Sequence, residues 1–111
     1  MIHAIRLYFV APQNSYAFIE ALRDGGLWRE SVRHLYPGLI GFDLLRSRTV
    51  PAIFVSIEFW VSEEAYRAAS NSPAMPVLAR FLKNLGVACV DLGAFSFPPR
   101  DDAKDTGNRR A

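Results

Sequence analysis

The sequence contains one cysteine, Cys89, among its 111 residues. A single cysteine cannot form an intrachain disulfide, so the fold does not depend on an oxidising compartment. Cys89 lies in the apolar run Val87–Val90. A catalytic thiol needs an activating neighbour, so this setting predicts a packed structural cysteine.

Long apolar runs and a signal-peptide pattern are also missing. No apolar stretch approaches the ~18 residues of a membrane span, and the first residues lack the basic-then-apolar order of a leader. These features predict a cytoplasmic protein with no membrane partner.

Neither sign of charge predominates, because 13 basic and 11 acidic residues give a formal net charge of only +2. Nucleic-acid binding needs a basic stripe or a known module, and the sequence has neither, so no nucleic-acid partner is expected. His3 and His34 each lack a second ligand at metal-binding spacing, so no metal site is expected.

Aromatic residues make up 13% of the chain, and apolar residues 50%. This length and composition predict one globular domain with one core, over residues 1–97. Residues 98–111 read PPRDDAKDTGNRRA and contain no aromatic or branched aliphatic side chain. That segment cannot bury apolar surface, and a disordered tail is predicted.

The most informative stretch is Ala52–Tyr66. Alternation predicts a strand, in which Ile53, Val55, Ile57 and Phe59 share an apolar face. The opposite face carries Phe54, Ser56, Glu58 and Trp60. Ser62 is a predicted helix N-cap, followed by two glutamates where the helix dipole favours negative charge.

The remaining elements follow from periodicity and from glycine and proline breaks. Asp24-Gly25-Gly26 predicts a break or kink in the first helical segment. The predicted elements are a strand at 2–10, a helical segment from Asn14 or Ser15 to 35, strands at 39–48 and 53–60, helices at 62–70 and 74–85, and a last strand at 87–97.

This order is the βαββαβ pattern of the ferredoxin-like α+β fold, with a four-stranded antiparallel sheet covered by helices on one face. The first and third strands are expected side by side and parallel in its centre. The uncovered face would be apolar, and such a patch marks an interface. We therefore predict a homodimer with two sheets packed face to face. The face residues are Ile5, Leu7, Phe9, Ile53, Val55, Ile57 and Phe59.

The other sheet face combines polar and aromatic residues, namely Arg6, Tyr8, Ser56, Glu58 and Trp60. One interpretation is a buried ion pair within an ordinary core. The other is a pocket between sheet and helices, with Trp60 as its wall and polar groups orienting a ligand. Periodicity alone slightly favours the buried ion pair within an ordinary core.

Several motifs together resemble the antibiotic biosynthesis monooxygenase family of the dimeric α/β-barrel superfamily. The resemblance spans about residues 2–97. The motifs are Pro37-Gly38, Glu58-x-Trp60-x-Ser62-x-x-Ala65, Ser72-Pro73 and Gly93-x-Phe95.

The resemblance implies a cofactor-free oxygenase acting on an anthrone- or quinol-like aromatic substrate. Trp60 matches a pocket tryptophan of that family, and substrate deprotonation would feed electrons directly to dioxygen. Arg6 would supply positive charge, and Glu58 would be a base if burial raises its pKa and Arg6 does not hold it charged. These three are the predicted catalytic residues. The predicted substrate-binding residues are Tyr8, Ser56, Phe54, Tyr66, Phe18, Leu22 and Leu78, with Tyr8 or Tyr66 donating a hydrogen bond.

Haem-degrading relatives use an asparagine on the first strand and a histidine after the third. Arg6 stands at the former position, and residues 70–85 contain no histidine. The resemblance therefore implies no haem, and no cofactor is expected.

Two other functions stay open at this stage. One is a non-catalytic dimeric module that binds a small ligand or stabilises an assembly. The other is a barrel isomerase, cyclase or decarboxylase. A cavity lined by Arg6, Tyr8, Glu58 and Trp60 would favour an enzyme. A space filled by Phe18, Leu22, Phe54 and Leu78 would favour the module. The sequence does not identify the substrate.

Overall fold

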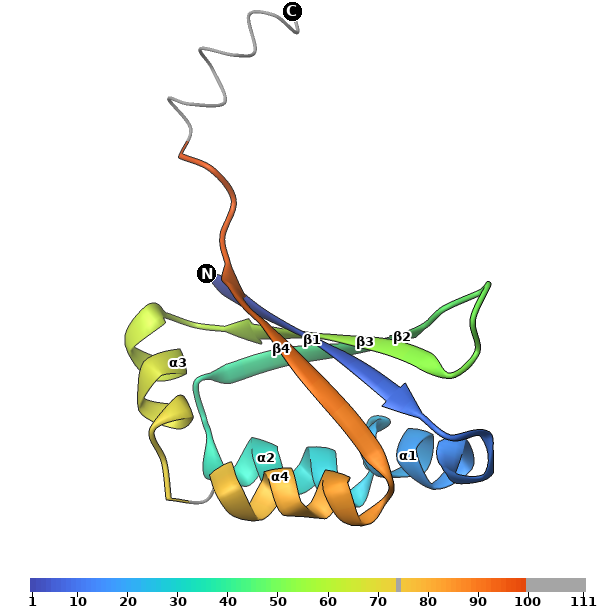
Figure 1. Cartoon of the computed structure of the whole chain (residues 1–111). Helices are drawn as coiled ribbons and strands as arrows, with labels where there is room; N and C mark the ends of the chain where they lie inside the picture. The colour runs from blue at the N-terminus through green and yellow to red at the C-terminus, as the bar shows by residue number, and fades with distance from the viewer. Residues whose placement is uncertain (74, 100–111) are drawn as a thin grey trace, which may run out of the picture.

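The computed structural model describes residues 1–73 and 75–99, apart from the side chains of Met75 and Leu78. A four-stranded sheet has the order β2-β3-β1-β4, and the helices lie on one side of it (Figure 1). The strands are β1 (Ile2–Val10), β2 (Leu39–Arg46), β3 (Ile53–Trp60) and β4 (Val87–Phe95). The helices are η1 (Pro12–Asn14), α1 (Ser15–Leu22), α2 (Leu27–Leu35), α3 (Glu63–Ser70) and α4 (Met75–Asn84). This arrangement confirms the predicted ferredoxin-like α+β fold.

The expected parallel pairing of the first and third strands is wrong. β1 and β3 are central neighbours, but they are antiparallel, with Arg6 opposite Ser56 and Tyr8 opposite Phe54. β3 also pairs antiparallel with β2. Because β3 lies between β1 and β2 and opposes both, the parallel relationship belongs to β1 and β2, which are not adjacent.

The predicted break between the first two helical segments is confirmed. Gly25 has φ 82°, a left-handed conformation that favours glycine. A Cβ on Gly26 would lie 2.4 Å from the carbonyl oxygen of Ala21, so a side chain does not fit there. The chain therefore ends α1 and starts α2 in a new direction, which lets α2 run beneath the sheet.

The start of α3 is also as predicted. The Ser62 hydroxyl accepts a hydrogen bond from the backbone N–H of Ala65 at 3.1 Å. This is the N-cap that satisfies one of the free amides of a first helical turn.

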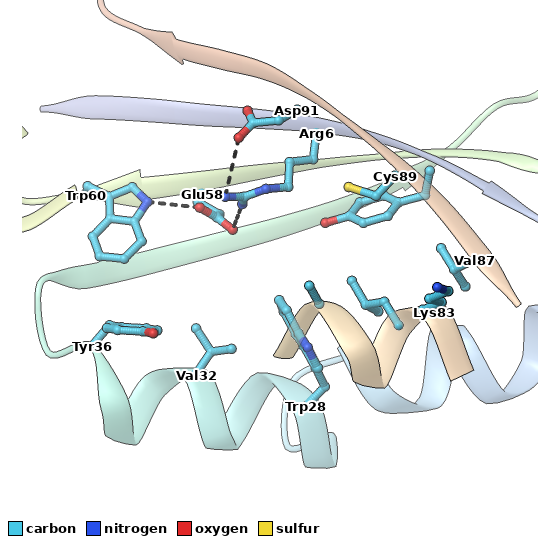
Figure 2. Close-up of a pocket in the computed structure, with 13 residues that line it drawn as sticks. Arg6, Trp28, Val32, Tyr36, Glu58, Trp60, Lys83, Val87, Cys89 and Asp91 are labelled. Atoms are coloured by element: carbon cyan, nitrogen blue, oxygen red, sulfur yellow. Dashed lines mark hydrogen bonds and ion pairs between the residues drawn. The ribbon is translucent and has the colours of Figure 1, made fainter. Parts of the chain in front are cut away.

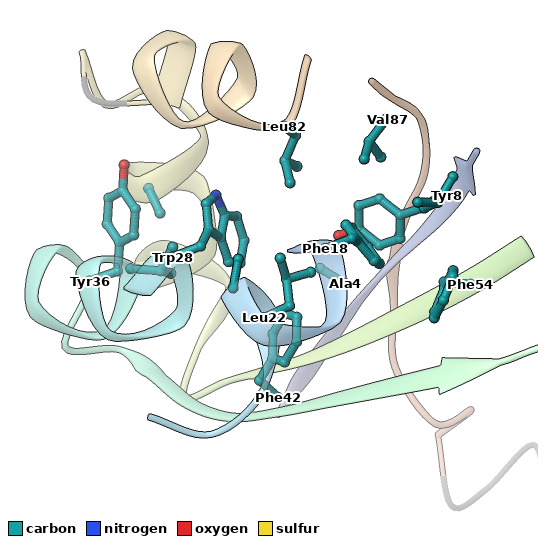
Figure 3. Packing of buried hydrophobic residues seen from close by; sticks show 14 of the residues in the cluster. Ala4, Tyr8, Phe18, Leu22, Trp28, Tyr36, Phe42, Phe54, Leu82 and Val87 are labelled. Carbon is teal, nitrogen blue, oxygen red and sulfur yellow. The ribbon is translucent and has the colours of Figure 1, made fainter. Parts of the chain in front are cut away.

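The core lies between the sheet and the helices (Figure 3). Phe18 of α1 is fully buried, with its ring 5.2 Å from that of Tyr8 and 5.0 Å from that of Phe54. The residues of β3 alternate between half-buried and fully buried, and the mixed set faces the helices, as predicted.

The opposite sheet face has no helix over it (Figure 1). Phe9 is 42% exposed, and its neighbours on that face are only partly buried in the single chain. The predicted homodimer stays a prediction at this point.

Most of the predicted tail, residues 100–111, lies outside the described residues. The division into a domain at 1–97 and a tail at 98–111 therefore stays a prediction. None of the helices in the described part of the chain is long and apolar enough to cross a membrane.

Candidate functional site

A cavity of about 390 Å³ lies between the inner face of the sheet and helices α2 and α4 (Figure 2). Its volume falls in the ~300–1,000 Å³ range of small-molecule sites. The residues that line it are Arg6, Tyr8, Trp28, Val32, Tyr36, Glu58, Trp60, Ala79, Leu82, Lys83, Val87, Cys89 and Asp91.

A charged network occupies the sheet side of this cavity. Arg6 of β1 pairs through Nη1 with Oε2 of Glu58 on β3. The indole Nε1–H of Trp60 donates to Oε1 of the same carboxylate at 3.0 Å. Both oxygens of Glu58 therefore have a donor, and the predicted meeting of Arg6 and Glu58 is confirmed.

Burial dominates the electrostatics of Glu58, whose residue exposure is 3%. Loss of solvation raises the pKa of the Glu58 carboxyl above its ordinary value, although Arg6 and the Trp60 hydrogen bond oppose this. A carboxylate with a raised pKa is a stronger base than one on the surface. Burial is the largest single influence on Arg6 and lowers its pKa, but the neighbouring groups Glu58, Tyr8, Asp91 and Cys89 together raise that pKa above its ordinary value, so the guanidinium stays charged.

Arg6 has a second carboxylate nearby, which the sequence did not reveal. Its Nη2 lies 3.9 Å from Oδ2 of Asp91 on β4. The β1–β4 register shifts between Ile5 and Arg6, and Gly93 beside this shift has φ 95°. The Gly93 N–H donates to Oδ1 of Asp91 at 2.8 Å, which holds the carboxylate at the bulge.

Cys89 is not the packed cysteine that its apolar neighbours predict. It is exposed and lines the cavity, because its position on β4 is opposite Tyr8 on the inner face. Although the residue as a whole is exposed, partial burial of its thiol raises the pKa of Cys89, and Arg6 only partly offsets this. The neutral thiol is therefore the dominant form at pH 7.

Tyr8 and Ser56 form a buried polar pair behind the cavity wall. Their hydroxyl oxygens are 2.8 Å apart, and both residues are 0% exposed. Burial raises the pKa of Tyr8 well above its ordinary value, so this residue is a neutral phenol. Tyr8 lines the cavity, whereas Ser56 does not and contacts Tyr8 from within the core.

The sequence did not predict which residues line the helix side of the cavity. Trp28, Val32 and Tyr36 line it from α2 and its C-cap. Their spacing of four residues puts them on one helix face. That spacing is visible in the sequence, but it equally describes an ordinary core stripe.

Several predicted substrate-binding residues lie elsewhere. Phe18, Leu22 and Phe54 pack in the core and do not line the cavity. Tyr66 of α3 packs against the ring of Trp60 at 5.9 Å without lining the cavity. Leu78 belongs to α4, but its side chain lies outside the described residues.

Within the described residues, no group of three or more His, Cys, Asp or Glu side chains is placed to hold a metal ion. The polar groups of the cavity are instead a carboxylate pair around one guanidinium, two phenol hydroxyls, two indoles, the ammonium of Lys83 and the thiol of Cys89. This set can accept a proton, stabilise an anion and hold a flat apolar ligand.

The sequence model of a family described as antibiotic biosynthesis monooxygenase matches residues 1–79. No curated protein matches the chain. Among solved structures, one similar protein comes from Deinococcus radiodurans and is provisionally described as an antibiotic biosynthesis monooxygenase. It is 15% identical with a TM-score of 0.67, and the match covers 89% of this chain and 94% of the Deinococcus chain.

SnoaB, a cofactor-independent oxygenase from Streptomyces nogalater, is 20% identical with a TM-score of 0.65, and the match covers 88% of this chain and 93% of SnoaB. A conserved protein of unknown function from Bacteroides thetaiotaomicron is 22% identical with a TM-score of 0.65, covering 86% and 96%. At these identities the structural likeness shows a shared fold.

Proposed function

The chain belongs to the antibiotic biosynthesis monooxygenase family, and we propose that it is a cofactor-independent monooxygenase. The proposed substrate is a small electron-rich aromatic of the anthrone or quinol class, oxidised by dioxygen in the cavity above α2. The similarity of the fold to that of SnoaB, a cofactor-independent oxygenase, supports this choice of reaction.

One observation carries the proposal. The cavity is lined by Arg6, Tyr8, Glu58 and Trp60, the set that favours an enzyme. Phe18, Leu22 and Phe54 do not fill it, because they pack in the core beside α1. A charged network beside an apolar hollow suits a substrate that is flat and apolar but must become an anion.

In the proposed reaction Glu58 removes a proton from the activated CH₂ group of the substrate. The resulting anion is stabilised by Arg6 and gives electrons to dioxygen, which then bonds to the same carbon. Loss of water from that peroxide completes the balance: a CH₂ group and O₂ become C=O and H₂O, with no outside reductant. Asp91, 3.9 Å from Arg6, keeps the guanidinium paired when Glu58 takes up the proton.

The proposed assembly is a homodimer formed through the outer face of the sheet. This face carries partly buried apolar side chains from β1 and β3 and has no helix over it. Apolar patches of this kind mark interfaces, and a two-fold axis would bury each patch against its copy. A cytoplasmic location stays a prediction from the sequence.

Oxygen uptake by the purified protein, without added cofactor, tests the proposed function. The panel contains anthrones, quinols and catechols, with Trp60→Phe and Arg6→Ala run beside the wild type. Arg48→Ala is the matched control, since Arg48 is exposed in the β2–β3 turn. Uptake above autoxidation that falls in both cavity variants and survives in the control supports the proposal.

A non-catalytic ligand-binding module is the second candidate. Both oxygens of Glu58 are already paired, with Arg6 and with Trp60, which also fits a purely structural network. Saturable ligand binding with no oxygen uptake on any substrate of the panel would favour this candidate.

A further inference from the structure

Two buried polar atoms at the cavity have no hydrogen-bond partner among the described residues. They are the indole Nε1 of Trp28 and the hydroxyl of Tyr36. Trp28 is 8% exposed and Tyr36 7% exposed, and both side chains line the cavity. A buried polar group without a partner destabilises a protein, so such groups are rare and each one calls for an explanation, such as a catalytic role or a bound partner.

The other buried polar side chains around the cavity are already partnered. Glu58 accepts from Arg6 and Trp60, and Tyr8 shares a hydrogen bond with Ser56. The unused hydrogen-bonding capacity is therefore on the helix side, opposite the charged network (Figure 2).

The chemistry of these two atoms restricts what can satisfy them. An indole N–H can only donate, so its partner must be an acceptor such as a carbonyl or phenolate oxygen. A phenol hydroxyl can donate or accept. The two residues are eight positions apart, about 12 Å along a helix axis at ~1.5 Å per residue, with apolar Val32 between them.

We propose that Trp28 and Tyr36 are the specificity-determining residues of this cavity. Trp28 donates Nε1–H to an acceptor oxygen of a flat, fused-ring ligand, Val32 supports the apolar rings, and the Tyr36 hydroxyl binds a second oxygen. Both polar atoms are shielded in the free chain, so ligand binding requires each ring to turn until its polar atom faces the cavity. This inference rests on the proposed function only in taking the cavity as the substrate site, and it does not need turnover.

Equilibrium dialysis with 9,10-anthraquinone tests the assignment. This probe carries two carbonyl acceptors on a fused-ring frame and cannot itself be oxidised at those carbons. Anthracene has the same frame without oxygen. We expect saturable binding of anthraquinone, weakened on the order of 3- to 10-fold by Trp28→Phe and by Tyr36→Phe. Anthracene binding should be equal in Tyr36→Phe and wild type.

Thermal melting supplies the second readout. Tyr36→Phe removes one oxygen that has no partner in the free protein, so it should melt at or above the wild-type temperature while binding anthraquinone less tightly. Tyr16→Phe, at a residue 75% exposed on α1, is the matched control and should change neither quantity. Trp28→Phe also shrinks a buried ring, so Tyr36→Phe decides the test if Trp28→Phe folds poorly.

The inference is overturned if wild type shows no saturable anthraquinone binding, or if Tyr36→Phe binds it as tightly as wild type. A Tyr36→Phe protein that melts well below wild type would also overturn it, because the hydroxyl would then have a partner in the free chain. Absence of oxygen uptake with intact, Tyr36-dependent binding would instead reject the proposed function and leave this inference standing.

Discussion

The indole Nε1–H of Trp60 donates to Oε1 of Glu58 at 3.0 Å, between two side chains on the same face of β3. This hydrogen bond orients the carboxylate and favours its charged form. The Glu-x-Trp spacing of the sequence is thus a structural unit: the strand period places donor and acceptor side by side. Variants of Trp60 and Glu58 test whether this hydrogen-bonded pair acts in catalysis.

Trp60→Phe keeps an aromatic ring on the cavity wall but removes the donor. We expect turnover to fall on the order of 100-fold, and the free energy of unfolding to fall by about 1–3 kcal/mol. Glu58→Gln keeps an oxygen that can accept the indole N–H but abolishes the base. If the two residues act as one unit, the double variant is no slower than Glu58→Gln alone. Additive losses would contradict a shared role.

The pH dependence of kcat/KM should report the ionisation of Glu58. Activity requires the charged base, so the rate should rise with pH through a pKa above the ordinary 4.5 of a glutamate. Arg6 lowers this pKa and Asp91 raises it, by their charges. Arg6→Met should therefore move the acidic limb to higher pH, and Asp91→Asn should move it to lower pH. Shifts of the same sign in both variants would contradict the assignment of this limb to Glu58.

Substitutions of Phe18 test whether this residue packs in the core or contacts the ligand. The sequence predicts it as a substrate contact, but its ring is fully buried against Tyr8 and Phe54. Phe18→Ala should lower the free energy of unfolding by about 3–5 kcal/mol in a urea titration. The milder Phe18→Leu should fold and bind anthraquinone as wild type does. A selective loss of binding in Phe18→Leu would place the ligand nearer α1 than the cavity indicates.

If the chain forms a dimer through the outer face of the sheet, a charge placed on that face should dissociate the dimer. Val55 is central on β3, between Leu7 and Leu45. Val55→Glu should lower the molar mass measured by light scattering from about twice the 12.4 kDa chain mass to the chain mass. Ala68→Glu on the exposed side of α3 adds the same charge away from that face and should stay dimeric. A wild-type chain that is monomeric at high concentration would contradict the proposal.

Local sequence patterns predicted the element order and the faces that β1 and β3 turn to the helices. Alternation along β1 and β3 was sufficient to place Arg6 and Glu58 on one face, where they pair. Gly25 and Gly26 predicted the break between α1 and α2, and each glycine meets a different need there: Gly25 has a left-handed φ, and Gly26 approaches the Ala21 backbone too closely for a side chain.

The lining of the cavity was harder to predict, since it depends on which apolar residues leave space between them. Trp28 and Phe18 both read as members of a helical apolar stripe, yet Trp28 lines the cavity and Phe18 fills the core. Asp91 and Cys89 face the cavity because β4 pairs with β1 in a register that shifts between Ile5 and Arg6. No local sequence pattern reveals this shift. The parallel direction expected for β1 and β3 is wrong because the β2–β3 hairpin reverses the chain, so that β3 runs opposite to β2 and also to β1.

Incorporation of labelled oxygen tests directly whether dioxygen supplies the new oxygen atom of the product without a metal or cofactor. The protein, freed of metal by a chelator and given no cofactor, is incubated under ¹⁸O₂ with the substrate of the uptake panel that it oxidises fastest. We expect one labelled atom in the carbonyl of the product and the other in water, with smaller amounts of both labelled products from Trp60→Phe. A product whose new oxygen comes from unlabelled water, or turnover that stops once metal is removed, would contradict the proposed reaction.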